Sequence, residues 1–138
     1  MNILLDTNVV LDEILRREPF YNPAADIIAL AKLGCFTAFM SASTVTDMYY
    51  IACKDIKDKT LVMSRLKALL KTVEIAAVTG VEIHRAVDLA WTDFEDCVQF
   101  AAGESLAVRY IITRDAEGFA SSGIPVVSPE KFLDMITV

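Results

Sequence analysis

Residues 3–8 read Ile3-Leu4-Leu5-Asp6-Thr7-Asn8, an apolar run that ends abruptly in three polar side chains. A short, continuous apolar run is typical of a strand that is buried on both faces of a parallel sheet. Val9, Val10 and Ile14 follow at helical spacing, so a helix is expected next. A strand that passes directly into a helix is the repeating unit of parallel sheets, because parallel strands need a crossover connection.

The same alternation of strands and helices continues along the chain. Four further apolar runs predict strands at residues 35–40, 73–77, 110–113 and 124–127. The residues that favour helix starts between these runs are Pro23, Ser43 or Thr44, Asp58, Thr79 or Gly80, Asp93 and Pro129. The sequence therefore predicts an α/β fold in a single domain of residues 1–138, a three-layer α/β/α sandwich with a central parallel sheet of four to five strands.

Length and composition agree with one packed domain. The 138 residues are enough for a core of their own, and 54% of them are hydrophobic. No apolar run approaches the roughly 20 residues that span a bilayer, and no secretory signal pattern is visible. We therefore expect a cytoplasmic protein with no membrane association. The three cysteines, Cys35, Cys53 and Cys97, are widely spaced, which predicts packed thiols rather than disulfides or a zinc site.

Four aspartates stand where predicted strands or helices begin or end: Asp6, Asp47, Asp96 and Asp115. In an open parallel sheet, ligands bind beyond the carboxyl ends of the strands, where the strand order reverses. Asp6 and Asp115 therefore face each other if the first and fourth predicted strands are neighbours. Buried carboxylates are costly unless a cation accompanies them, and Mg²⁺ or Mn²⁺ is a hard cation that carboxylate oxygens bind. The pattern predicts a divalent-metal site.

Three further residues are candidates for supporting this site. Asn8 lies in the turn after Asp6, and Thr113 lies two residues before Asp115, so each can orient a metal ligand. Asp93 lies three residues before Asp96 at the start of the same predicted helix. It is a candidate cap, a candidate supporting group and a candidate ligand.

Each of these aspartates also has a purely structural interpretation. Asp6 and Asp93 are good helix N-caps, and Asp96 suits a first helical turn, where the macrodipole favours negative charge. Asp47 is compatible with an exposed helix position, and Asp115 with an ordinary turn after a strand. Both interpretations stay open at the level of the sequence.

The net charge of −6 argues at first against a nucleic-acid partner. Setting aside the four aspartates and Asp93 leaves 14 acidic against 13 basic residues, so most of the surplus belongs to the predicted site. Residues 54–71 contain six bases and two acids, which makes them locally basic. The candidate contacts to a phosphate backbone are Lys54, Lys57, Lys59, Arg16 and Arg17. The alternative is a solvated helix face.

Leu5-Asp6-Thr7-Asn8, Asp47, Asp93-Phe94-Glu95-Asp96 and Ile112-Thr113-Arg114-Asp115 together resemble the PIN domain family, in order and spacing along the whole chain. The resemblance implies a ribonuclease that depends on Mg²⁺ or Mn²⁺, often as the toxin of a bacterial toxin–antitoxin pair. Asp6, Asp96 and Asp115 match the acidic positions of the family. Asp47 departs from the pattern, because the family usually carries glutamate there.

Under this resemblance, Asp6 and Asp96 are the principal metal ligands, and Asp47 and Asp115 complete the catalytic set. The implied partners are single-stranded or structured RNA, an antitoxin protein and a second copy of the chain. The rival interpretation is a PIN-fold module that binds nucleic acid or protein without catalysis. The shorter side chain of Asp47 and the acidic net charge favour this rival.

Overall fold

A computed structural model describes residues 1–137 of the chain. Within this range, one parallel sheet contains the strands β1 (Asn2–Leu5), β2 (Thr37–Ser41), β3 (Glu74–Ala76), β4 (Tyr110–Ile112) and β5 (Val126–Val127). Their order across the sheet is β3-β2-β1-β4-β5, and every neighbouring pair is parallel. The first and fourth strands are therefore neighbours, and the strand order reverses between them.

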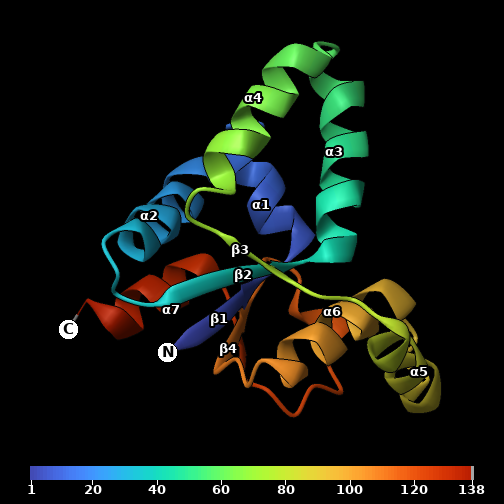
Figure 1. The fold of residues 1–138 in the computed structure, drawn as a ribbon. Coiled ribbons are helices and arrows are strands. Elements are labelled where there is room, and N and C mark those ends of the chain that lie inside the picture. The colour runs from blue at the N-terminus through green and yellow to red at the C-terminus, as the bar shows by residue number, and fades with distance from the viewer. Residues whose placement is uncertain (138) are drawn as a thin grey trace.

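Helices cover both faces of this sheet (Figure 1). The α-helices of residues 1–137 are α1 (Thr7–Ile14), α2 (Tyr21–Lys32), α3 (Ala42–Ile56), α4 (Lys59–Leu69), α5 (Gly80–Leu89), α6 (Phe94–Ser105) and α7 (Pro129–Ile136). A short 3₁₀ helix, η1 (Ala116–Phe119), follows β4. The predicted three-layer α/β/α architecture with a parallel central sheet is confirmed.

The side chains of β1 alternate between the two helical layers. Ile3 and Leu5 are fully buried in the core cluster that α1, α2, α3, α4 and α7 share. Leu4 points to the opposite face, where it packs in a second cluster with Phe100 of α6 and Phe119 of η1. Burial on both faces explains why β1 reads as a continuous apolar run.

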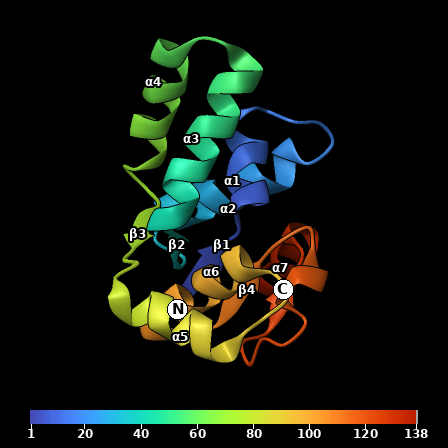
Figure 2. The same cartoon turned by 90° about the vertical axis from the view of Figure 1, so that its right-hand side faces the viewer.

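Helices α3 and α4 form a hairpin that projects from the sheet (Figures 1 and 2). Helix α3 begins at the carboxyl end of β2 and runs outward to Ile56. Lys57, with a left-handed backbone (φ 57°), and Asp58, which caps α4, make the turn at the tip. The locally basic segment thus occupies the outer part of α3, the tip and α4.

Some predicted boundaries were wrong by a few residues. Strand β2 spans Thr37–Ser41 rather than 35–40, and Ser41, not Ser43 or Thr44, caps α3 by accepting the N–H of Thr44 at 3.1 Å. The last residue of the strand is therefore also the cap, and no loop intervenes. Helix α2 begins two residues before Pro23, because N–H groups in a first helical turn have no intrahelical partner and proline is tolerated there.

Most predicted helix starts are confirmed: Asp58, Thr79 and Asp93 cap α4, α5 and α6, and Pro129 opens α7. The last three predicted strands are shorter than expected, and β5 begins only at Val126 because the preceding proline has no N–H to donate. Cys97 is buried as expected, but Cys35 is exposed, because it lies in the turn after α2. The predicted domain end, residue 138, lies outside the described residues.

Candidate active site

Asp6 lies at the carboxyl end of β1, where it caps α1. Its side chain is buried, with 6% of the residue exposed. The carboxylate accepts three hydrogen bonds, from the N–H of Thr7 at 2.6 Å, from Nε2 of Gln99 at 2.9 Å and from Oγ1 of Thr113 at 2.6 Å. Burial raises the pKa of Asp6 above its usual value, although these three donors oppose the shift.

Two further acids lie at the start of α6. Asp93 caps the helix by accepting the N–H of Asp96 at 3.0 Å, so its predicted capping role is observed. Asp96 is half-buried, and its pKa is raised to about 7, first by burial and then by the negative charges of Asp6, Asp93 and Asp115. A shift of this kind marks a group whose charge the protein does not neutralise by itself.

Gln99, which the sequence analysis missed, joins the two principal aspartates. It is buried on α6, and its Nε2 lies 2.9 Å from Oδ1 of Asp6 and 3.4 Å from Oδ1 of Asp96. Its Oε1 accepts a hydrogen bond from Oγ1 of Thr44 at 3.3 Å, which fixes the orientation of the amide. One feature of the sequence could have indicated it: Gln99 is the single polar residue in the apolar stretch 97–102, three positions after Asp96.

The residues that were predicted to support the site also lie together. Thr113 is buried, and its Oγ1 donates to Asp6 and lies within hydrogen-bond distance of Nδ2 of Asn8 (3.2 Å) and of the N–H of Asp115 (3.0 Å). Oδ1 of Asn8 accepts the N–H of Arg114 at 3.3 Å. The end of β4 is thereby joined to the end of β1, which holds Asp115 near the other acids.

Two pockets adjoin these carboxylates. Asp6, Asp47, Glu95 and Asp96 are among the residues that line a pocket of about 340 Å³. Asp93 and Asp115 line a second pocket of about 380 Å³. Neither pocket has a lysine or arginine among its lining residues in the described chain. The structure therefore brings all five predicted acids to one edge of the sheet and adds Glu95, which the sequence analysis did not select.

The chemistry of this donor set fits a hard divalent cation. The available donors are carboxylate oxygens, which Mg²⁺ and Mn²⁺ prefer, and no thiolate or imidazole lines either pocket in residues 1–137. In the same range, no three His, Cys, Asp or Glu side chains are already arranged as a closed metal-binding group. The carboxylates are engaged in hydrogen bonds, Asp6 with Gln99 and Thr113 and Asp93 with the N–H of Asp96.

Asp12, on helix α1, is a buried carboxylate that pairs with arginines. Only 1% of its side chain is exposed, and its carboxylate accepts hydrogen bonds from Arg114 at 2.6 and 3.1 Å and from Nε of Arg17 at 3.0 Å. The guanidinium of Arg114 also lies 3.8 Å from the ring centroid of Phe20. Arg17, a predicted RNA contact, is therefore engaged in an ion pair with Asp12.

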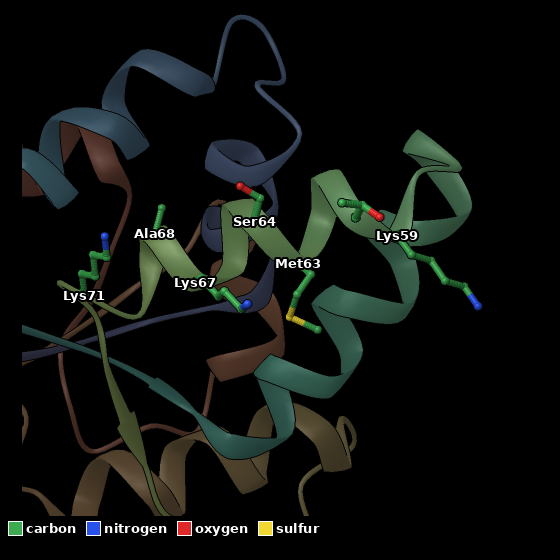
Figure 3. A pocket seen from close by; sticks show the side chains of 7 residues that line it. Lys59, Met63, Ser64, Lys67, Ala68 and Lys71 are labelled. Atoms are coloured by element: carbon green, nitrogen blue, oxygen red, sulfur yellow. The ribbon is translucent and has the colours of Figure 1, made fainter.

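The remaining predicted RNA contacts lie on different surfaces. Nζ of Lys54 lies over the ring of Tyr50, 4.4 Å from its centroid, and Tyr50 lines the pocket of Asp6 and Asp96. Lys59 lines an open groove of about 610 Å³ along α4 with Lys67 and Lys71 (Figure 3). Arg16 lies apart from both, in a smaller groove between α1, α2 and α4.

A parallel three-layer fold with carboxylates gathered where β1 and β4 end defines a class of acidic-site α/β proteins. The model of the PIN domain family matches residues 2–117. This chain belongs to the PIN domain family.

The chain is also similar to individual proteins. The chain is 25% identical to Ribonuclease VapC1 of Aquifex aeolicus over 137 residues, which cover 96% of this chain and 93% of that protein. A toxin–antitoxin complex from Klebsiella pneumoniae contains a chain with a TM-score of 0.65 and 23% identity, covering 92% of this chain and 97% of that one. Mycobacterium tuberculosis VapC20, described as a sarcin–ricin loop cleaving toxin, gives a TM-score of 0.70 at 14% identity, covering 88% and 95%. These two structures share the fold.

Along residues 1–137, no helix has the length and apolar character needed to cross a membrane.

Proposed function

We propose that this protein is an endoribonuclease that hydrolyses RNA phosphodiester bonds with the help of Mg²⁺ or Mn²⁺ at the acidic edge of the sheet. The observation that carries this proposal is the pair Asp6 and Asp96, which are buried or half-buried beside other acids without a basic side chain in their pockets. Membership of the PIN domain family and the similarity to Ribonuclease VapC1 support it.

Asp6 and Asp96 would provide the principal metal ligands, and Asp47, Asp93 and Asp115 would complete the carboxylate set around them. When bound, the metal ion lowers the pKa of a water molecule and stabilises negative charge on the phosphate oxygens. Glu95 lines the same pocket as Asp47 and adds a carboxylate on the side where Asp47 is one methylene shorter than the usual glutamate.

Hydrogen-bonded residues around the site orient the carboxylate of Asp6. Gln99 and Thr113 donate to the two oxygens of Asp6, which fixes the plane of this carboxylate and favours its charged form. Asn8 and Thr44 hold Thr113 and Gln99 in turn. Because these groups come from α1, α3, α6 and the end of β4, four parts of the fold keep Asp6 oriented before substrate binds.

RNA would reach the acids along the hairpin of α3 and α4. Tyr50 and Ile51 line the pocket of Asp6 and Asp96, and Lys54 covers the Tyr50 ring one turn further out. Lys57 and Lys59 follow at the hairpin tip, where positive charge suits a phosphate backbone. We assign Arg16 only a peripheral part, and we assign Arg17 to the Asp12 ion pair.

The biological role that fits best is the toxin of a toxin–antitoxin pair. The similarity to chains in toxin–antitoxin complexes supports an antitoxin protein as a partner, and a homodimer is a further expectation from the family. A catalytically silent PIN-fold module is less favoured, because the chain retains acids at all the expected positions and Asp47 lines the same pocket as Asp6 and Asp96.

The decisive experiment is a cleavage assay with purified, metal-depleted protein and a labelled single-stranded RNA. We expect cleavage after addition of Mn²⁺ or Mg²⁺, none in EDTA, and none by Asp6→Asn with either metal. A control variant, Asp26→Asn on the exposed face of α2, should cleave like the wild type. RNA binding without cleavage in every metal would instead favour the binding module.

A further inference from the structure

Gly118, in the 3₁₀ helix η1, lies against the carboxylate of Asp96. A Cβ atom at position 118 would overlap Oδ2 of Asp96, and it would stand 3.1 Å from Cγ of Asp96 and 3.7 Å from Oδ2 of Asp93. Of the five glycines in the chain, Gly118 alone has a carboxylate in this space. A side chain at position 118 therefore cannot be added without movement of Asp96 or of η1.

The backbone gives no other reason for glycine at this position. Gly34, two residues after the end of α2, has a positive φ of 84°, whereas Gly118 has no such conformation. Alanine adopts the backbone of Gly118 without strain, so the constraint comes only from the space that the Asp96 side chain occupies.

The main chain of Asp96 has little freedom to adapt. Its N–H is held by Asp93 at 3.0 Å, and the helix that carries it packs directly on η1. A methyl group at position 118 must therefore act on the Asp96 side chain, which has to rotate away from its present position. Because Nε2 of Gln99 lies 3.4 Å from Oδ1 of Asp96, this rotation also changes the link to Asp6.

We propose that Gly118 is a positioning residue for Asp96: its missing side chain provides the space in which the carboxylate lies. A methyl group at position 118 displaces the carboxylate from its place between Asp6 and the α6 cap. Only the consequence for metal affinity rests on the proposed function. The physical coupling between Gly118 and Asp96 exists in the metal-free protein.

The first test measures melting temperatures in EDTA for Gly118→Ala, Asp96→Ala and the double variant. We expect Gly118→Ala to lower the melting temperature by about 2–4 °C, because the carboxylate of Asp96 has to leave the position that the added methyl group takes. In the Asp96→Ala background, the same substitution should cost nothing, because the overlapping carboxylate is gone. Gly123→Ala is the matched control, because Gly123 has open space around its Cβ position and no positive φ.

The second test titrates Mn²⁺ into the same metal-free proteins and measures affinity by calorimetry. We expect Gly118→Ala to bind Mn²⁺ about 10-fold to 100-fold more weakly, as when an orienting neighbour of a ligand is lost. Gly123→Ala should bind like the wild type. This affinity loss supports the proposal even if Asp96 rotates without a thermal cost.

Two results overturn the proposal. One is a Gly118→Ala protein that equals Gly123→Ala in both melting temperature and Mn²⁺ affinity. The other is a thermal loss that persists undiminished in the Asp96→Ala background, because the steric conflict then lies elsewhere. If the wild type itself binds no Mn²⁺, the proposed metal function fails, and the metal-free melting temperatures alone decide the coupling between Gly118 and Asp96.

Discussion

Asp6 caps helix α1 and Asp12 lies in its last turn, and both are buried, yet their surroundings are opposite. Asp12 accepts hydrogen bonds from two arginines, Arg114 and Arg17. Asp6 receives only neutral donors and has Asp96 and Asp115 as charged neighbours. Two arginines of the chain therefore pair with Asp12, whose buried carboxylate serves the structure. In residues 1–137, no arginine or lysine lines the pockets at the acidic edge of the sheet.

This difference has an energetic meaning. A buried charge without a partner costs several kcal/mol, and a protein normally avoids it by pairing or by protonation. Burial and three acidic neighbours raise the pKa of Asp96 to about 7, so this carboxylate can lose its charge by binding a proton. A bound divalent cation would instead pair with the charged carboxylate, and the proposed activity requires such a cation.

The largest effect that we predict concerns Asp96→Asn. This substitution keeps the size of the side chain but removes the charge that a hard metal needs, so cleavage should fall by about three orders of magnitude or more. Metal-free stability should stay the same or rise, because repulsion among the acids is relieved. RNA cleavage with Mn²⁺ and urea unfolding in EDTA measure the two effects. An active but destabilised variant would contradict the proposed role of Asp96 and would leave it as a dipole partner of α6.

The second prediction concerns Asp12→Ala, on the paired side of the comparison. It leaves Arg114 and Arg17 without their carboxylate, so the free energy of unfolding should fall by about 2–4 kcal/mol. The increase in melting temperature expected with Mn²⁺ should persist, because Asp12 lines neither pocket at the acidic edge. Asp26→Ala, an exposed position on α2, is the matched control and should change stability by less than about 0.5 kcal/mol. If Asp12→Ala lost the stabilisation by Mn²⁺ but kept its metal-free stability, Asp12 would be a metal ligand and not a structural ion-pair partner.

The third prediction concerns pH. Because the folded-state pKa of Asp96 is about 7 against an ordinary value of 3.8, the folded protein binds more protons than the unfolded chain between these values. This contribution to stability is fully present below about pH 3.8 and is lost as the pH rises through about 7. Asp6 shifts in the same direction. Urea unfolding in EDTA should show this fall in the wild type, and Asp96→Asn should reduce it. Equal pH profiles for the two proteins would show that Asp96 is not perturbed.

The gathering of the acids could be predicted from the sequence because strand topology determines it. Once β1 and β4 are neighbours in a parallel sheet, Asp6 and Asp115 must meet at one edge, and the cap of α6 brings Asp93 and Asp96 to the same place. Gln99 escaped detection because a single polar residue on a helix suits an exposed position as well as a buried one. The pairing of Asp12 with Arg114 spans 102 residues, so no local pattern reveals it. Ser41 was missed as a cap because it is also the last residue of a strand.

The smallest predicted effect concerns the hairpin, where positive charge is exposed and distant from the buried acids. Replacing Lys57 and Lys59 by glutamate should weaken RNA binding several-fold and flatten its dependence on salt, by about one unit of slope per lost phosphate contact. The charge-matched control is Arg109→Glu with Lys131→Glu, two exposed positions just before β4 and on α7 that line neither the groove of Lys59 nor that of Arg16. Fluorescence anisotropy at several salt concentrations measures both. If the two double variants behave alike, the hairpin lysines act only through net charge.

We propose that the acidic edge of the sheet binds a divalent cation that the chain's own side chains do not replace. Calorimetric titration of Mn²⁺ into metal-depleted wild type, Asp6→Asn and Asp12→Asn tests it directly. We predict saturable binding by the wild type, loss of this binding in Asp6→Asn and its retention in folded Asp12→Asn. A wild type that binds no Mn²⁺, or an Asp6→Asn variant that binds it equally well, would contradict the claim.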